Sequence, residues 1–347
     1  MTTMRGVFLP GDRRVEIRDV PVPEPGPGQV LVRMKASSIC GSDLRAIYRP
    51  TEQGSGPEAY RGVIAGHEPA GIVESVGPGA LRFQVGDRVA VYHIAGCGLC
   101  HDCREGWMIS CSSPARAAYG WQRDGGHAPY LLAEERTLVS LPDQLSFLDG
   151  SIVACGLGTA YAACLRLGIS GADRVLIAGL GPVGVGAAMV ARGLGAEVVG
   201  VEASAGRRMV ARRLAIEVVE AEPDEVGEAL RDRSDGDGFE VAIDCSGNPA
   251  GRALCLASAR PWGRVAFIGE GSSVAFDVSP ILIHPQLTII GSWVCSIGHM
   301  EDLVGLLVRW GLRPEQMVTD RFEIADAAEA YRTADAADGG KVAFTWQ

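Results

Sequence analysis

The stretch that decides the fold is RVLIAGLGPVG, from Arg174 to Gly184. RVLIAG (174–179) is a short apolar run typical of a buried strand, and the next glycines open a helical stretch, VGVGAAMVARGLG. Glycine permits the tight turn, the approach of the backbone to a pyrophosphate and close packing of helix on strand. The helix N-terminus then offers unpaired N–H groups to phosphates. The context predicts a dinucleotide-binding turn, against the alternative of a glycine-rich packing turn.

The dinucleotide hypothesis requires an acidic residue about 20 positions further on, at the end of the next strand. Glu202 ends the predicted strand EVVGVE (197–202). A carboxylate there accepts hydrogen bonds from the ribose hydroxyls and repels a 2′-phosphate, which favours NAD. Arg207 and Arg208 favour the alternative, NADP, because a nearby arginine can accommodate that phosphate.

The pattern of predicted strands and helices changes near residue 152. After it, strands alternate with helical stretches, which predicts βαβ units and a parallel sheet. Before it, short β runs are separated by turn signals such as Pro-Gly and Gly-Asp. We therefore expect an antiparallel β domain followed by a doubly wound α/β domain, and a short C-terminal strand. The expected strands are 30–36, 70–77, 87–94, 174–179, 197–202, 240–247, 263–271, 287–291 and 341–346.

Composition narrows the class of protein. At about 150 residues per domain, 347 residues predict two domains. Forty-two acidic against 32 basic residues give a net charge of −10, which argues against a general nucleic-acid-binding role. The apolar runs are too short to predict a membrane span. The N-terminus, MTTMRGVFLPGDRR, lacks the apolar region of a signal peptide, so we expect a cytoplasmic protein.

Four of the ten cysteines crowd into one segment, CGLCHDCREGWMISC (97–111). In a reducing compartment such cysteines are better explained by a metal than by disulfides. Four thiolates can surround one Zn²⁺ tetrahedrally at about 2.3 Å, which leaves no position for a substrate and so predicts a structural zinc. Redox cysteines and an iron–sulfur cluster are the competing interpretations. The predicted ligands are Cys97, Cys100, Cys103 and Cys111.

A second set is dispersed along the chain, in CGSD (40–43), GHE (66–68) and CGLGT (155–159). Each motif alone is weak, since a lone buried cysteine is usually a small hydrophobic residue. Together, Cys40, His67 and Cys155 offer two thiolates and one imidazole. Three protein ligands with an open fourth position are typical of a catalytic zinc site.

With these motifs in this order, the chain resembles the zinc-dependent medium-chain alcohol and polyol dehydrogenases over essentially its whole length. The resemblance implies a GroES-like β domain over 1–153, with a C-terminal return over 292–347, and a Rossmann domain over 154–291. It implies reversible hydride transfer between an alcohol, secondary or polyol, and NAD to give a ketone or aldehyde. It also implies a small-molecule alcohol or ketone as partner, and a homodimer or homotetramer.

Residue by residue, the resemblance makes Ser42 the acceptor of the alcohol proton and Asp43 the carboxylate that orients the ligating histidine. Glu68 matches an acidic neighbour that can swing onto the metal, and His93 falls where the family has a side chain of the substrate pocket. Val183 and Thr159 match positions behind the nicotinamide ring. The cofactor-binding residues it implies are Thr159, Gly179, Gly181, Pro182, Val183, Gly184, Glu202, Arg207, Ile268, Gly269, Ser292 and Trp293.

Two departures from the family pattern matter. Relatives commonly place a histidine shortly after the proton-accepting serine, where this chain has Leu44 and Arg45. A guanidinium stays charged and cannot relay protons, so we expect a route through the cofactor ribose and water. Val294 replaces an arginine that polyol dehydrogenases often show, which weakens a sugar-alcohol assignment. The remaining alternatives are an NADP-linked reductase of an activated carbonyl and a non-catalytic, zinc-stabilised dinucleotide-binding protein.

Overall fold

The computed structural model describes residues 2–220 and 224–347. These residues form two compact units. The first unit contains the chain up to Gly158 together with Cys295–Ala337 and Lys341–Gln347, and the second contains Thr159–Val294 and Asp338–Gly340. The C-terminal segment therefore returns to the unit in which the chain begins.

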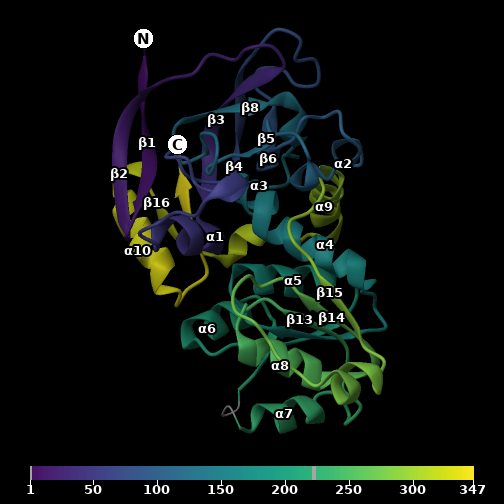
Figure 1. Cartoon of the computed structure of the whole chain (residues 1–347). Helices are drawn as coiled ribbons and strands as arrows, with labels where there is room; N and C mark the ends of the chain where they lie inside the picture. The colour runs from purple at the N-terminus through teal and green to yellow at the C-terminus, as the bar shows by residue number, and fades with distance from the viewer. Residues whose placement is uncertain (1, 221–223) are drawn as a thin grey trace. The chain divides into compact units, whose positions relative to one another are not determined.

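The first unit is built on a seven-stranded sheet in the order β16-β17-β3-β4-β5-β9, with β8 also pairing β3. The last strand, β17 (yellow in Figure 1), pairs antiparallel with β3, and Ala343 lies opposite Ser38. Ser38 in turn lies opposite Glu68 of β4. The expected antiparallel pairing is confirmed for these strands, and only β16 and β17 run parallel.

The expectation of one strand over 87–94 is wrong. Pairing in β5 stops at Val91, and a second, two-residue strand, β6, begins only at Ile94. Tyr92 leaves the ladder with β9 and donates its N–H to the carbonyl of Thr137. The break turns the buried ring of His93 toward His67, with ring centroids 5.3 Å apart.

The helical stretch Phe147–Leu167 is long and apolar enough to cross a membrane by length and composition, but 89% of its most apolar window is buried inside the protein. Its apolar character is therefore that of a core helix. The stretch opens with a capping box, in which Ser146 accepts from the Asp149 N–H and Asp149 accepts from the Ser146 N–H. Its middle, Val153–Leu157, is a π-helical turn, a feature often found at functional sites.

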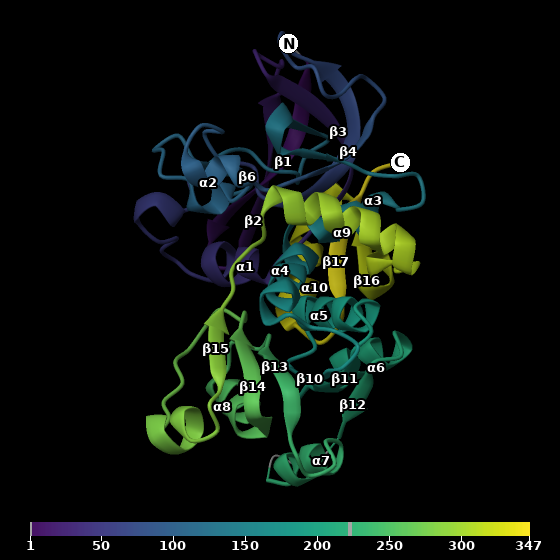
Figure 2. The ribbon, with the colours of Figure 1, turned by 90° about the vertical axis from the view of Figure 1, so that its right-hand side faces the viewer.

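The second unit is a six-stranded parallel sheet in the order β12-β11-β10-β13-β14-β15, visible side by side in Figure 2. In chain order this is 3-2-1-4-5-6, the arrangement of the Rossmann fold. The strands are apolar because helices cover the sheet; Val175, Leu176 and Ile177 of β10 are fully buried. The predicted fold class, a GroES-like β domain with a Rossmann domain, is confirmed.

Two predicted strands end earlier than expected. Strand β13 stops at Asp244 and β14 at Phe267, so 245–247 and 268–271 are turns rather than strand. The buried carboxylate of Asp244 accepts the N–H groups of Ser246 and Gly247, which draws the chain out of the sheet. These turns lie at the carboxyl ends of the strands, where open α/β sheets bind ligands.

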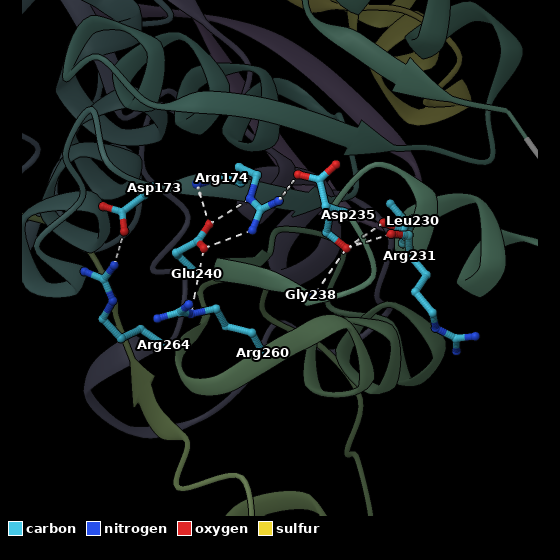
Figure 3. A network of polar contacts seen from close by, with 10 residues as sticks. Asp173, Arg174, Leu230, Arg231, Asp235, Gly238, Glu240, Arg260 and Arg264 are labelled. Atoms are coloured by element: carbon cyan, nitrogen blue, oxygen red, sulfur yellow. Dashed lines mark hydrogen bonds and ion pairs between the residues drawn. The ribbon is translucent and has the colours of Figure 1, made fainter.

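The opposite ends of the strands carry a network of ion pairs (Figure 3). Arg174, at the start of β10, contacts Glu240 at 3.2 Å and Asp235 at 3.0 Å. Arg264 pairs with Asp173. A single partly exposed pair of this kind contributes little to stability. The network, however, joins β10, β13 and β14 at the ends of the strands opposite the predicted cofactor site.

The elements of the first unit are β1 (Thr3–Gly11), β2 (Arg14–Pro21), β3 (Gln29–Ser38), α1 (Gly41–Asp43), η1 (Leu44–Tyr48), η2 (Gly56–Glu58), β4 (Glu68–Val76), β5 (Arg88–Val91), β6 (Ile94–Ala95), α2 (His101–Arg104), η3 (Met108–Ser110), β7 (Ala117–Ala118), β8 (Tyr130–Glu134), η4 (Glu135–Thr137), β9 (Leu138–Ser140), α3 (Phe147–Ile152), η5 (Val153–Leu157), α9 (Ile297–Trp310), η7 (Pro314–Met317), β16 (Val318–Phe322), η8 (Ile324–Asp326), α10 (Ala327–Ala336) and β17 (Lys341–Thr345). Those of the second are α4 (Gly158–Leu167, whose first residue belongs to the first unit), β10 (Arg174–Ala178), α5 (Pro182–Gly193), β11 (Glu197–Val201), α6 (Ala205–Arg213), β12 (Glu217–Val219), α7 (Val226–Asp232), β13 (Phe239–Asp244), α8 (Pro249–Ser258), β14 (Ala259–Phe267), η6 (Ser279–Ile283) and β15 (Thr288–Gly291).

Candidate metal centres and cofactor edge

The four clustered cysteines converge in a lobe between β6 and β7. One sulfur from each, Cys97, Cys100, Cys103 and Cys111, lies within 4.8 Å of the others. Four sulfurs placed tetrahedrally at about 2.3 Å from a zinc ion are about 3.8 Å apart, and the Cys97 and Cys103 sulfurs are separated by 4.0 Å. The donor set therefore fits one tetrahedral zinc ion.

Backbone N–H groups of this lobe stabilise the thiolate form of Cys97. The Cys97 sulfur accepts hydrogen bonds from the N–H groups of Leu99 at 3.4 Å and Cys100 at 3.3 Å. These bonds lower the pKa of the Cys97 thiol to about 6. Thiolate is the form that ligates a metal, so the local backbone favours metal binding. His101, in the same lobe, is largely exposed and is not a member of the donor set.

The dispersed motifs also converge. Ligand atoms of Cys40, His67, Glu68 and Cys155 all lie within 4.8 Å of one another. The Cys40 and Cys155 sulfurs are 3.9 Å apart, close to the spacing that one tetrahedral zinc requires. The hydrogen bond between these thiols lowers the pKa of Cys40 and raises that of Cys155. The spacing of the two sulfurs in this set fits a zinc ion.

Local structure orients the imidazole and the serine beside it. The Asp43 carboxylate, fully buried, lies 2.7 Å from His67 Nδ1 and also accepts the Cys40 N–H at 3.0 Å. With Nδ1 bound to a carboxylate, Nε2 is the atom left for a metal. Ser42 Oγ lies 3.3 Å from that Nε2. The structure thus brings the Ser42 hydroxyl beside the imidazole atom that is left for a metal.

Glu68 is held in place by groups that the sequence did not single out. Lys341 Nζ lies 2.5 Å from Glu68 Oε2, and both side chains are at most 2% exposed. Ser38 donates its hydroxyl to the same oxygen at 2.5 Å, and the Gly156 N–H donates to Oε1 at 3.4 Å. A signal for Lys341 existed, since it is one of two lysines in the chain and opens the apolar run KVAFTW.

Two aromatic side chains border this centre. His93 stands 5.3 Å from His67, ring centroid to ring centroid, and its Nδ1 lies 2.8 Å from the Ala154 carbonyl. Burial lowers the pKa of His93 to about 4, so the ring is neutral at pH 7 and Nδ1 carries the proton that it donates. The Trp121 ring meets His67 edge-on at 6.4 Å.

The glycine-rich turn of the second unit follows β10 as predicted. Gly179 has a φ of +91°, and a Cβ on Gly184 would lie 1.8 Å from the Gly179 carbonyl oxygen, so only glycine fits there. Helix α5 begins at Pro182 with Gly181 as its N-cap. The Arg207 guanidinium carbon lies 3.6 Å from where a Cβ on Gly181 would be. A positive charge and a helix N-terminus therefore meet at this turn.

Glu202 follows β11 immediately, beside the glycine-rich turn. Its carboxylate accepts the N–H groups of Leu180 at 2.8 Å and Ser204 at 2.9 Å, and lies 3.9 Å from Arg207. Arg208 donates to the backbone carbonyls of Glu202 and Ala203, and its guanidinium pairs with Glu220 at 3.0 Å rather than with the Glu202 carboxylate. Of the two arginines, Arg207 is thus the one at the turn.

The remaining predicted cofactor residues lie on the same unit. Ile268 and Gly269 both donate their N–H groups to the Asp244 carbonyl, at 3.0 and 2.9 Å, which fixes the turn after β14. Ser292 donates its N–H to the Phe267 carbonyl at 3.2 Å. The side chains of Thr159, Ile268 and Ser292 are buried, and that of Trp293 is exposed.

The chain is similar to known dehydrogenases in sequence. Residues 26–143 match the family model for the alcohol dehydrogenase GroES-like domain, and residues 182–309 match that for zinc-binding dehydrogenases. The chain is 47% identical to the zinc-type alcohol dehydrogenase-like protein YphC of Escherichia coli K12, covering 100% of this chain and 99% of that one. It is 32% identical to L-threonine 3-dehydrogenase of Pyrococcus horikoshii, covering 95% and 94%.

A solved structure, acetophenone reductase from Geotrichum candidum in complex with NAD, is similar with a TM-score of 0.85 and 27% identity, over 99% of this chain and 97% of that one. The fold and the matches define an oxidoreductase of the alcohol dehydrogenase class. The chain belongs to the zinc-dependent medium-chain dehydrogenase family, which confirms the resemblance seen in the sequence.

Proposed function

We propose that this protein is an NAD-linked, zinc-dependent dehydrogenase that interconverts an alcohol with a ketone or aldehyde. The observation that carries the proposal is the convergence of Cys40, His67 and Cys155, from three distant motifs, beside the Ser42 hydroxyl. Cys97, Cys100, Cys103 and Cys111 form the structural zinc site of the same proposal. A purely structural, non-catalytic role would not explain why Cys40, His67 and Cys155 converge beside the Ser42 hydroxyl.

Each functional residue of the first unit has its own role in the proposed reaction. Cys40, His67 and Cys155 hold the catalytic zinc, which supplies Lewis-acid polarisation of the substrate oxygen when bound. Asp43 keeps the proton of His67 on Nδ1 and so keeps Nε2 available. Ser42 accepts the proton of the alcohol. Glu68, held by Lys341 and Ser38, has a carboxylate oxygen within 4.8 Å of all three ligand atoms.

The residues of the second unit hold the cofactor, whose nicotinamide carries the hydride chemistry. The turn Gly179–Gly184 and Arg207 take the pyrophosphate, and Glu202 takes the adenosine ribose. The turns after β14 and β15, with Thr159 and Val183, border the nicotinamide. The Glu202 carboxylate favours NAD over NADP because it repels a 2′-phosphate.

The names of two similar proteins indicate a class of substrate. The threonine dehydrogenase named above acts on a secondary alcohol by its name, and acetophenone reductase acts on a ketone. We therefore propose a secondary alcohol as substrate, with a homodimer or homotetramer as the working form. The test is the rate of NADH formation, followed by absorbance, over a panel of secondary alcohols, polyols and amino alcohols, with NADP in parallel. No turnover of any alcohol by the zinc-loaded enzyme would contradict the proposal.

Replacing Ser42 with alanine should lower kcat by about 10²–10⁴-fold, the usual contribution of a positioned proton acceptor. Ser42→Thr, which keeps the hydroxyl, should retain most of the activity. Both variants should keep their full zinc content, because Ser42 is not a ligand. Steady-state rates with metal analysis on the same samples measure both quantities. An alanine variant as fast as the threonine variant would remove Ser42 from the mechanism.

Replacing Glu202 with alanine should raise the KM for NAD by about 10- to 100-fold, since a hydrogen bond to a charged group contributes about 1.5–3 kcal/mol. The preference for NAD over NADP should fall as well, because the repulsion of a 2′-phosphate is gone. The matched control is Glu197→Ala, an exposed carboxylate at the other end of the same strand, which should leave both KM values unchanged. An unaltered cofactor preference in Glu202→Ala would contradict the assignment.

A further inference from the structure

A pocket of about 550 Å³ lies in the first unit beside the four-cysteine lobe. One wall is the segment from Ile109 to Ala117, and Glu58, Arg61 and Gln122 complete it. Pockets of about 300–1,000 Å³ hold small organic molecules. Cys111, one of the proposed structural zinc ligands, contributes to the wall, but none of the catalytic or cofactor residues proposed above lines this pocket.

The pocket contains a buried guanidinium with donors to spare. The Arg116 side chain is only 9% exposed, and its one ion pair, to Glu58 at 2.8 Å, uses a single terminal nitrogen. Its Nε–H is buried and has no hydrogen-bond partner among the described residues. A guanidinium has five N–H donors, and a buried donor left unpaired is energetically unfavourable. Because Arg116 lines the pocket, an acceptor that enters it would meet a guanidinium of which Glu58 uses only one terminal nitrogen.

A second guanidinium lines the same pocket. Arg61 is exposed, and within residues 2–220 and 224–347 its side chain makes no hydrogen bond or ion pair. Two arginines against one carboxylate, Glu58, leave the charged side chains of the wall with a net charge of +1. The hydroxyls of Ser110, Ser112 and Ser113 add neutral donors. Arginine binds carboxylate and phosphate through paired N–H groups, so this wall suits an anion.

We propose that this pocket binds the carboxylate or phosphate group of a small organic anion through Arg116 and Arg61. A chain of contacts leads from the pocket to the candidate catalytic centre: the Arg61 backbone N–H donates to the Trp121 carbonyl at 2.8 Å, and the Trp121 ring centroid lies 6.4 Å from that of His67. The anion is either the charged end of the substrate, a reading that rests on the proposed function, or a separate effector.

Binding is tested by calorimetric titration of the zinc-loaded, full-length protein with inorganic phosphate. Saturating NAD is present to fill the pyrophosphate site of the second unit. We expect saturable binding, a Kd at least 10-fold weaker in Arg116→Gln, and a severalfold weaker Kd in Arg61→Gln, which alters an exposed side chain and leaves the fold intact. The matched control is Arg104→Gln, an exposed arginine of α2 outside the pocket, with an unchanged Kd.

Inhibition of alcohol oxidation by phosphate separates the two sources of the anion. Inhibition competitive with the alcohol identifies the charged end of the substrate, and noncompetitive inhibition identifies an effector; both support the pocket. Absence of saturable binding, or equal binding by the wild type and both pocket variants, overturns it. Oxidation of neutral alcohols without phosphate binding contradicts the pocket alone, whereas phosphate binding without any alcohol oxidation contradicts the proposed function alone.

Discussion

His67→Ala should reduce alcohol oxidation by at least about 10³-fold and leave the protein with one zinc ion per chain instead of two. The imidazole is one of only three ligands proposed for the catalytic zinc, and its loss leaves two thiols whose sulfurs are 3.9 Å apart. The loss of a single group that stabilises charge in the transition state already costs about 10²–10³-fold. The four-cysteine lobe has its own donor set and should keep its ion. Rates of NADH formation and zinc content per chain measure both effects.

The matched control is His101→Ala, because His101 lies in the four-cysteine lobe yet is largely exposed and outside both donor sets. It should retain wild-type activity and two zinc ions. Binding of NADH to His67→Ala, measured by cofactor fluorescence, should stay close to the wild-type value, because the cofactor residues lie on the other unit. Near-normal turnover by His67→Ala would show that the dispersed set does not hold a catalytic metal.

The parts of this molecule that the sequence predicted are those encoded within short stretches of chain. The strand and turn RVLIAGLGPVG and the cysteines of 97–111 each specify their structure through neighbours a few residues apart. The apolar run, the glycines and the cysteine spacing are therefore visible without knowledge of the tertiary fold. Strand ends were less accurate, since the ends of β13 and β14 depend on side-chain bonds from Asp244 to the turn beyond.

The parts that could not be predicted depend on pairing between distant segments. Glu68 meets Lys341 only because β17 pairs with β3 and β3 with β4. Nothing in the local sequence fixes that register. Likewise Arg116 meets Glu58 through loops that have no periodic pattern. The dispersed set of Cys40, His67 and Cys155 was accessible only as a set of residue types suited to zinc and through resemblance to a family, because its spacing along the chain carries no geometry.

Lys341→Met should destabilise the first unit by about 3–5 kcal/mol, the usual cost of removing one partner of a buried ion pair. Burial opposes the charged form of Lys341, but the attraction of Glu68 more than offsets it and raises the lysine pKa, while burial also raises the pKa of Glu68. Methionine fills a similar volume but leaves the Glu68 carboxylate with only the Ser38 hydroxyl and the Gly156 N–H as donors. The thermal unfolding midpoint should fall by roughly 10 °C.

The double variant Lys341→Met/Glu68→Gln separates loss of packing from an unpaired charge. If the charge is responsible, the neutral amide should restore a large part of the stability, and the coupling energy between the two positions should exceed about 1 kcal/mol. The other lysine provides the control: among the described residues the half-buried Lys35 ammonium donates only to the Gln347 carbonyl, so Lys35→Met should change stability by less than about 0.5 kcal/mol. Equal stabilities of Lys341→Met and Lys35→Met would mean that Glu68 does not need its lysine. The carboxylate beside the proposed zinc ligands would then be held by Ser38 and the backbone alone.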